Sequence, residues 1–233
     1  MGKKKEDKSK GSDQSVNSVV KELEKNIFSI KFYPVAVDEE TKEEAVKYLK
    51  KTYKEGNETV KQLILYMLHE NISEFSEFRF VHNFEYMKMK NPSVEPAKLR
   101  MDIYKKMFNY NTSIEGIMEL VSILGSLGGE DDSVKVLTYH YARLCAWESE
   151  ASIMLRNSII GALGESESSY ALKTLLEYAR NTDNEKTYHR LAMALEKWSE
   201  KLPNIKMPDS KRKKFRKTLT NVLAREFGGR HYG

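Results

Sequence analysis

The sequence predicts an all-α protein in which antiparallel helix pairs stack into an α-solenoid. Three observations lead to this fold class. Apolar residues recur at helical spacing through most of the chain, a helix–turn–helix unit repeats with a period in the mid-thirties, and no segment is rich in strand-forming residues. With 233 residues, 40% of them hydrophobic, the chain is long enough to bury a substantial core.

The clearest helix pair lies in residues 155–180. Apolar residues from Leu155 to Leu163 recur on one face of a helix with 3.6 residues per turn. Gly164 follows them, and we expect it to end this helix in the left-handed conformation that glycine adopts most easily. The polar residues 165–169 then form a turn and the next N-cap. The second helix carries its own apolar stripe, formed by Ala171, Leu172, Leu175, Leu176 and Ala179.

Copies of this unit flank it on both sides. Three pairs of segments match: Gly125–Gly128 with Gly161–Gly164 at an offset of 36, Tyr141-Ala-Arg with Tyr178-Ala-Arg at an offset of 37, and Arg190–Leu195 with Arg156–Leu163 at a shorter spacing. A single helix pair of this kind cannot bury its apolar faces alone and is expected to stack on its copies.

At these residues the chain resembles the HEAT-like repeat family, in its phycobilisome-lyase-type variant. The pattern of that family is Leu/Val-Arg, two apolar positions, Ala-Leu-Gly, a polar turn, and then Ala and Leu-Leu on the second helix. The resemblance extends over roughly residues 114–200 and is carried by Leu155, Arg156, Ile159, Ala162, Leu163, Gly164, Ala171, Leu175 and Leu176. It implies a right-handed, armadillo-like α-solenoid. It also implies a scaffold or binding module, although a fold alone does not dictate a function.

The N-terminal region, residues 15–111, is expected to be helical and to pack on the solenoid. Before it, residues 1–14 contain no apolar residue after the initial Met, so we expect a disordered, Lys-rich tail. Residues 16–23 predict a short helix. Residues 27–37 alternate loosely and contain a proline, which predicts an extended connector or an edge strand.

Two charged and apolar segments then predict two further helices. Asp38 is expected to cap the first, which runs to about Lys54 and ends at Gly56. Asn57 is expected to start the second, whose apolar face contains Val60, Leu63, Ile64, Met67 and Leu68.

Phenylalanine is concentrated in the segment that follows, at Phe75, Phe78, Phe80 and Phe84. Two interpretations are open. The rings form an aromatic wedge that joins the N-terminal helices to the solenoid, or they are exposed hot spots for a protein partner, since aromatic residues are enriched at such sites.

The repeats themselves are expected at residues 112–202, opened by Thr112 and Glu115 at the spacing of a capping box. Residues 203–233 then form a linker bracketed by two prolines, followed by a basic C-terminal helix. The apolar face of that helix contains Phe215, Leu219, Val222 and Leu223.

The net charge of +5 is unevenly distributed along the chain. Residues 1–14 carry +2, residues 209–233 carry +6, and residues 15–208 are therefore about −3. The most specific functional feature is a run of six cations, which are Lys211, Arg212, Lys213, Lys214, Arg216 and Lys217. Such a cluster favours binding to a polyanion, which could be nucleic-acid phosphate, an acidic protein or anionic lipid. The alternative without a binding function is a solvated helix face.

Catalytic and metal-binding patterns are missing from the sequence. His82 with Glu85, and Glu185 with His189, have helix-face spacing, but a di-metal bundle needs more paired elements, so no metal site and no cofactor are expected. Cys145 has no basic residue four positions away and is expected to be a packed structural residue. No phosphate loop, dinucleotide fingerprint or nucleophile elbow occurs, and the glycines at 125–129 are interpreted as helix caps.

The sequence therefore favours a non-catalytic HEAT-like scaffold that binds another protein. The alternative is a nucleic-acid-associated factor, for RNA or the ribosome in preference to DNA, that binds through its basic ends. A remote alternative is a HEAT-like alkylpurine DNA glycosylase, whose Trp, Asp and Arg site cannot be matched here, because Trp147 and Trp198 lie in different repeats. A single cysteine, no secretory signal and no long apolar run predict a cytoplasmic protein without a transmembrane segment.

Overall fold

The computed structural model describes the whole chain except residues 1–9, 76–87, 99–113, 128–130, 147–149 and 229–233. Across the described ranges the protein is all-helical and contains no strand, which confirms the predicted all-α class. The helices are α1 (Lys10–Lys31), α2 (Glu39–Glu55), α3 (Glu58–Phe75), α6 (Ile114–Ser126), α7 (Asp131–Leu144), α8 (Glu150–Glu165), α9 (Ser169–Asn181), α10 (Glu185–Lys201), η1 (Leu202–Asn204) and α11 (Asp209–Phe227).

Helix α1 differs from the sequence prediction at both ends. It begins at Lys10, inside the segment predicted to be a disordered tail, and it continues to Lys31 through residues predicted to be extended. The reason is helical spacing, since Leu23, Ile27 and Ile30 lie on one face of α1 and are buried. The proline that suggested a strand follows only after α1 has ended.

Helix α2 begins and ends where the sequence predicted, and α3 begins where it predicted. The Asp38 carboxylate accepts a hydrogen bond from the Thr41 amide at 2.7 Å, and the Gly56 amide donates to the Thr52 carbonyl as α2 ends. The Asn57 side chain accepts from the first turn of α3 in the same way, at 3.0 Å from the Val60 nitrogen.

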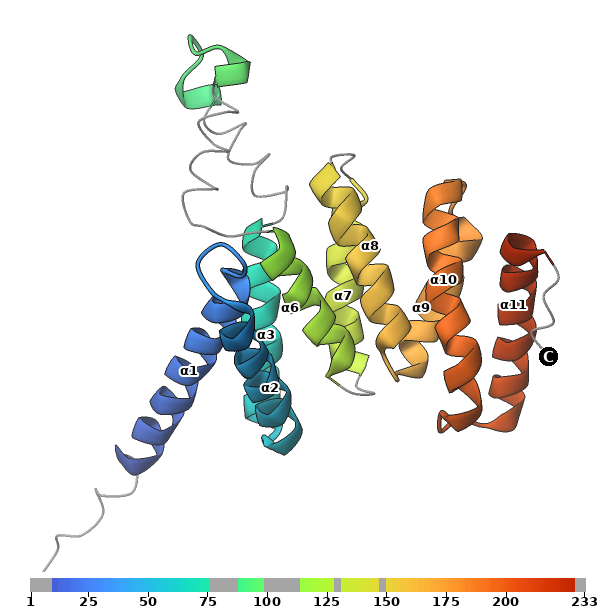
Figure 1. Ribbon diagram of the computed structural model, residues 1–233, viewed down its shortest axis with the longest axis horizontal. Coiled ribbons are helices and arrows are strands. Elements are labelled where there is room, and N and C mark those ends of the chain that lie inside the picture. Colours follow the sequence, from blue (N-terminus) through green and yellow to red (C-terminus); the bar gives the residue numbers. More distant parts are fainter. Residues whose placement is uncertain (1–9, 76–87, 99–113, 128–130, 147–149, 229–233) are drawn as a thin grey trace, which may run out of the picture.

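The remaining helices form two rows that run from α3 toward the C-terminus. Helices α6, α8 and α10 pack on one another in sequence order, and so do α7, α9 and α11. Each helix of one row also packs on its chain neighbour in the other row. Figure 1 shows α1, α2 and α3 at one end of the molecule and α11 at the other. The rows therefore place every second helix side by side, with α11 at the end of the stack.

Glycine brings the backbones of the first row into close contact. Gly125 lies within α6, where an added Cβ would overlap the carbonyl oxygen of Ala162 in α8. Gly164 lies within α8, where an added Cβ would stand 3.0 Å from the Cβ of Ala194 in α10. The prediction that these two glycines cap helices is wrong: each lies inside its helix, and both serve close approach between neighbouring helices.

Side chains of α10, rather than a glycine cap, donate hydrogen bonds to the last backbone carbonyls of α8. The Trp198 indole donates to the Leu163 carbonyl at 3.1 Å, and the Lys201 ammonium donates to the Gly164 and Glu165 carbonyls at 3.0 and 2.8 Å. The last carbonyls of a helix have no partner within the helix, so these bonds replace a C-cap. They also fasten α10 to α8.

Residues roughly one repeat apart contact each other in the second row as well. The rings of Tyr141 and Tyr178 stack with centroids 4.3 Å apart, and the sequence had aligned these two tyrosines at an offset of 37. The Ser168 hydroxyl, which caps α9, donates to Asp131 in the first turn of α7 at 2.5 Å. Equivalent positions of successive helix pairs therefore pack on one another.

A pair of histidines joins the N-terminal helices to the second row. His69 of α3 and His140 of α7 form a ring nitrogen contact of 3.1 Å, and His140 is buried. Burial, the His69 imidazole and the Arg143 guanidinium lower the pKa of His140 from 6.5 to about 3. His140 is therefore neutral in the folded protein at physiological pH.

The end of α7 and the start of α6 bear on two further sequence predictions. Cys145 is exposed, because α7 ends at Leu144 and the cysteine follows it on the surface, so the prediction of a packed residue is wrong. Thr112, predicted to open the first repeat, lies outside the described residues, and α6 begins at Ile114.

Candidate interaction surfaces

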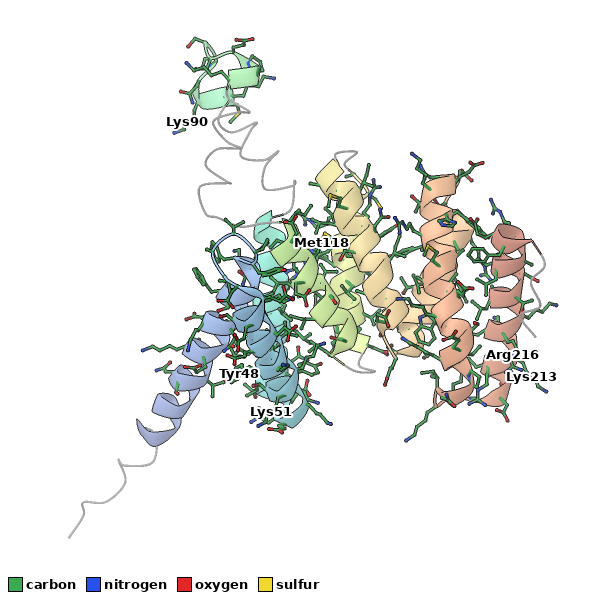
Figure 2. The ribbon with its side chains drawn as sticks, viewed as in Figure 1. Tyr48, Lys51, Lys90, Met118, Lys213 and Arg216 are labelled. Atoms are coloured by element: carbon green, nitrogen blue, oxygen red, sulfur yellow. The ribbon has the colours of Figure 1, made fainter. Side chains whose placement is uncertain are left out.

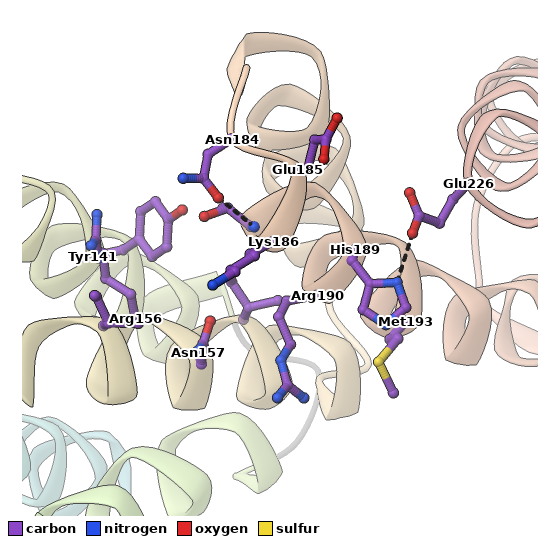
Figure 3. Close-up of a pocket in the computed structure, with 13 residues that line it drawn as sticks. Tyr141, Arg156, Asn157, Asn184, Glu185, Lys186, His189, Arg190, Met193 and Glu226 are labelled. Carbon is purple, nitrogen blue, oxygen red and sulfur yellow. Dashed lines mark hydrogen bonds and ion pairs between the residues drawn. The ribbon is translucent and has the colours of Figure 1, made fainter. Parts of the chain in front are cut away.

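A groove separates the exposed sides of α8 and α10. It has a volume of about 770 Å³, and Figure 3 shows the side chains of both helices directed into it. Glu226 of α11 and Tyr141 of α7 complete its walls. The full lining is Tyr141, Ile153, Arg156, Asn157, Ile160, Asn184, Glu185, Lys186, Thr187, His189, Arg190, Met193 and Glu226.

Apolar side chains lie exposed in this groove. Ile160 is buried at the α8 side, but Ile153 and Met193 are 42% and 44% exposed. These two residues lie off the buried stripes of their helices, which explains why no neighbouring helix covers them. Surface apolar residues occur singly on most proteins, but here two of them line one concave surface.

The groove is lined by three cations and two carboxylates, the latter being Glu185 and Glu226. Lys186 and Arg190 are exposed and, within the described part of the chain, have no acidic group within 4.0 Å. The Glu226 carboxylate is already engaged, because it lies 2.6 Å from the His189 ring. The sequence had suggested Glu185 as the partner of His189. The observed partner lies on another helix, and the contact ties α10 to α11.

The tyrosine at the other wall is a neutral group. Burial raises the pKa of Tyr141 to about 12, with a further contribution from the neighbouring Cys145 thiol. Its ring stacks on Tyr178 of the next helix pair. Tyr141 therefore offers the groove a fixed aromatic edge rather than a charge.

The sequence contained one signal for this groove. Arg156 and Arg190 had been aligned as equivalent positions of two repeats, and both line it. When a polar residue recurs at the same place beside the buried stripe of two repeats, its copies lie along the same edge of the two helices. In the sequence these two arginines indicate only the repeat, because the surface that they share is formed by the packing of α8 and α10.

The predicted polyanion-binding residues all lie on α11, but they do not act alike. Lys213, Lys214, Arg216 and Lys217 are exposed, and Figure 2 shows Lys213 and Arg216 at the end of the molecule that α11 forms. Within the described residues none of these four has an acidic group within 4.0 Å.

The other two cations of the set contact the protein itself. Arg212 turns inward, where its guanidinium donates to Asp209 at 2.9 Å and to the Ile205 carbonyl at 3.0 Å. The Lys211 ammonium lies 3.4 Å from the Ser169 hydroxyl and 5.6 Å from the centre of the Phe215 ring. Arg212 therefore links α11 to the chain that precedes it through its two terminal nitrogens, while its buried Nε has no hydrogen-bond partner among the described residues.

The phenylalanine cluster lies almost entirely outside the described residues. Phe75 is the last residue of α3, and Phe78, Phe80 and Phe84 fall in the range 76–87. The two interpretations of this cluster stay predictions.

Other chemistry is limited in the described part of the chain. No group of three His, Cys, Asp or Glu residues there could hold a metal ion. None of the helices described is both long and apolar enough to cross a membrane. Trp198 is fully buried, so its indole cannot contact a ligand in the way that a glycosylase site would require, and Trp147 falls in the undescribed range 147–149.

Two candidate interaction surfaces therefore lie on the described residues: a groove of mixed apolar and charged residues between α8 and α10, and a cationic face on α11. Comparison with protein-family models, with curated proteins and with solved structures found no match for this chain.

Proposed function

We propose that this protein is a non-catalytic scaffold of HEAT-like helical repeats that binds a protein partner in the groove between α8 and α10. The observation that carries the proposal is the pair of exposed apolar residues, Ile153 and Met193, that face one groove beside Arg190. Apolar anchors flanked by arginine are typical of protein-binding hot spots.

The packing of the helices supports the repeat part of this proposal. Every second helix is a neighbour, and the contacts between neighbours join residues about one repeat apart. The Tyr141–Tyr178 stack has this spacing, and the bond between Trp198 and the Leu163 carbonyl is similar, at a separation of 35 residues. In an α-solenoid each unit contacts only its neighbours and the stack exposes an extended surface for binding.

The groove predicts the chemistry of its partner. Met193 has a flexible and polarisable side chain, which adapts to apolar groups of different shape. Lys186 and Arg190 stand beside it with their charges unmatched by any described acidic group within 4.0 Å. The best-fitting occupant is therefore a helical segment with an apolar stripe flanked by Asp or Glu, because it would satisfy both the apolar residues and the cations.

Site-specific photocrosslinking in the native cell tests this proposal. A photoreactive amino acid is placed at Met193 in the full-length protein, and a matched control carries it at Tyr66 of α3, which is 61% exposed. We expect a discrete adduct from position 193 and none from position 66. The crosslinked segment, mapped by mass spectrometry, should contain an apolar stripe with acidic residues.

A binding measurement with that identified partner completes the test. The double variant I153E/M193E places two carboxylates against an acidic segment, so its Kd should rise at least about tenfold, which corresponds to about 1.4 kcal/mol. The control Tyr66→Glu should leave the Kd unchanged. No adduct from position 193, or a partner whose affinity ignores the double variant, would contradict the proposal.

A further inference from the structure

The exposed face of α11 carries a charge cluster that the folded protein does not neutralise. Lys213, Lys214, Arg216 and Lys217 occupy little more than one turn of helix, and the acidic residue nearest to them in α11, Asp209, is bound by Arg212. Like charges at spacings of three and four residues destabilise a helix. Stability of the chain alone therefore does not explain this cluster.

The orientation of α11 limits how a polyanion can bind. Its apolar residues Leu219, Val222 and Leu223 are buried against the stack, and Phe215 is partly buried in the same contact. A helix that inserts into a membrane surface must present its apolar face to lipid. Because that face is already covered, α11 cannot insert into a bilayer, and only its cationic side is available to a polyanion.

The spacing of the cations fits a phosphodiester backbone. Lys213 and Lys217 are one turn apart, about 6 Å along the helix axis. A nucleic-acid strand carries a phosphate about every 3.4 Å of duplex axis, so two neighbouring phosphates fall within the reach of this face. Arg216 lies between the two lysines in sequence, and its planar guanidinium can bind one phosphate through two hydrogen bonds.

We propose that the outer face of α11 binds the phosphate backbone of nucleic acid through Lys213, Lys214, Arg216 and Lys217, without reading base sequence. Arg212 takes no part, since its guanidinium is held by Asp209 and by the Ile205 carbonyl. The surface is separate from the groove between α8 and α10, so this binding does not depend on the proposed protein partner.

Fluorescence anisotropy with full-length protein tests the assignment. The probes are a single-stranded RNA, a single-stranded DNA of the same sequence and the corresponding DNA duplex, each measured over a series of salt concentrations. The triple variant K213A/R216A/K217A removes three exposed cations and keeps residues that favour helix. The matched control is K50A/K51A/K54A on α2, which removes the same charge from exposed positions at the other end of the molecule.

The wild type should bind with an affinity that falls steeply with salt. Loss of contacts to three phosphates should reduce the slope of log K against log salt by about 2 to 3, and should weaken binding at least tenfold at low salt. The α2 control should retain most of the affinity and the slope. The charge-retaining variant K213R/R216K/K217R should also bind, because the proposed contacts are electrostatic.

Three results would overturn the proposal. The first is that the α11 and α2 triple variants lose affinity equally, which would indicate net charge rather than a site. The second is an unchanged slope in the α11 variant. The third is binding to vesicles of anionic lipid without binding to any of the nucleic acids. Circular dichroism of each variant confirms that α11 and the rest of the fold are retained.

Discussion

The row of α6, α8 and α10 and the terminal helix α11 are held to the molecule in different ways. In the row, Gly125 and Gly164 bring helix backbones together, with alanines on the facing helices. Helix α11 is attached through side chains instead. The Tyr188 hydroxyl donates to the Val222 carbonyl at 3.2 Å, and Arg180 reaches the Thr218 hydroxyl at 3.4 Å.

The two kinds of attachment differ in how they tolerate substitution. Positions in the row where backbones touch do not accept a larger side chain, whereas the solvent-facing positions of α11 do. Where backbones touch, even one added methyl group must move a helix, because protein interiors are close-packed. Where side chains make the contact, the solvent-facing positions of the helix are free of packing constraints. The two candidate interaction surfaces follow this division, since the groove depends on the fixed spacing of α8 and α10, and the cations lie on the free side of α11.

The largest effect is expected at the close contact in α6. Gly125→Ala would place a methyl group against the Ala162 carbonyl, which belongs to backbone and cannot move alone. We expect the free energy of unfolding to fall by about 1 to 3 kcal/mol, the usual cost of overpacking. Urea unfolding followed by circular dichroism measures this change.

Gly161 provides the matched control within the same row. It also lies inside a helix, but an added Cβ meets nothing within 4 Å. Gly161→Ala should therefore raise the free energy of unfolding by about 0.5 to 1 kcal/mol, because alanine favours helix. If both substitutions shifted stability in the same direction, the distinction between close-contact and open glycines would fail.

An intermediate, pH-dependent effect is expected at the joint between α3 and α7. The unfolded chain takes up a proton on His140 near pH 6.5, whereas in the folded protein its pKa is about 3. The contribution of this residue is therefore fully present above pH 6.5 and is lost as the pH falls toward 3. The slope reaches at most about 1.4 kcal/mol per pH unit. The groups that face His140 are the His69 ring of α3 and, on its own helix, Tyr139 and Arg143.

Unfolding free energies of the wild type and of His140→Gln between pH 6.5 and 5 measure this effect. Glutamine keeps a hydrogen-bonding group beside His69 but cannot take up the proton. The range avoids the carboxyl groups of Asp38, Asp132 and Glu165, whose pKa values are held low by hydrogen bonds and which titrate under more acidic conditions. The wild type should lose stability more steeply than the variant. Equal slopes would show that His140 does not remain neutral on folding.

The sequence predicted the faces of the helices well because those faces are a local property. The apolar stripes around Leu155 and Leu175 are buried as expected. Asp38 and Asn57 accept hydrogen bonds from the first turns of α2 and α3, as expected for N-caps. In each case the signal and the structure that it specifies lie within one or two helical turns. The same local signal failed at Gly164, because a glycine after an apolar stripe suits a helix cap and a close helix contact equally well.

The candidate surfaces were less predictable because they depend on pairs of distant residues. His189 bonds to Glu226, 37 residues away, and not to the Glu185 that shares its helix. Arg212 looked identical in sequence to the cations around it, yet its position on α11 turns it toward the chain before the helix. Only the packing of one helix on another distinguishes such a residue from its exposed neighbours.

The smallest effect is expected at α11, and it tests whether adjacent cations have different roles. Arg212→Ala removes a guanidinium whose side chain is 28% exposed and which bonds to Asp209 and to the Ile205 carbonyl. We expect stability to fall by about 1 kcal/mol, less than for a fully buried charged hydrogen bond, because solvent weakens the contact. Lys213→Ala, one residue away and exposed, should raise stability by a few tenths of a kcal/mol, because it relieves repulsion from Arg216 and Lys217.

Nucleic-acid affinity should show the opposite order for the same two variants. Lys213→Ala removes one proposed phosphate contact and should lower the salt slope by roughly 1, whereas Arg212→Ala should leave the slope unchanged. A single property such as net charge cannot produce this reversal, because both variants remove one positive charge from neighbouring positions. If the two variants behaved alike in both assays, α11 would carry a uniform field and no division between structural and binding cations.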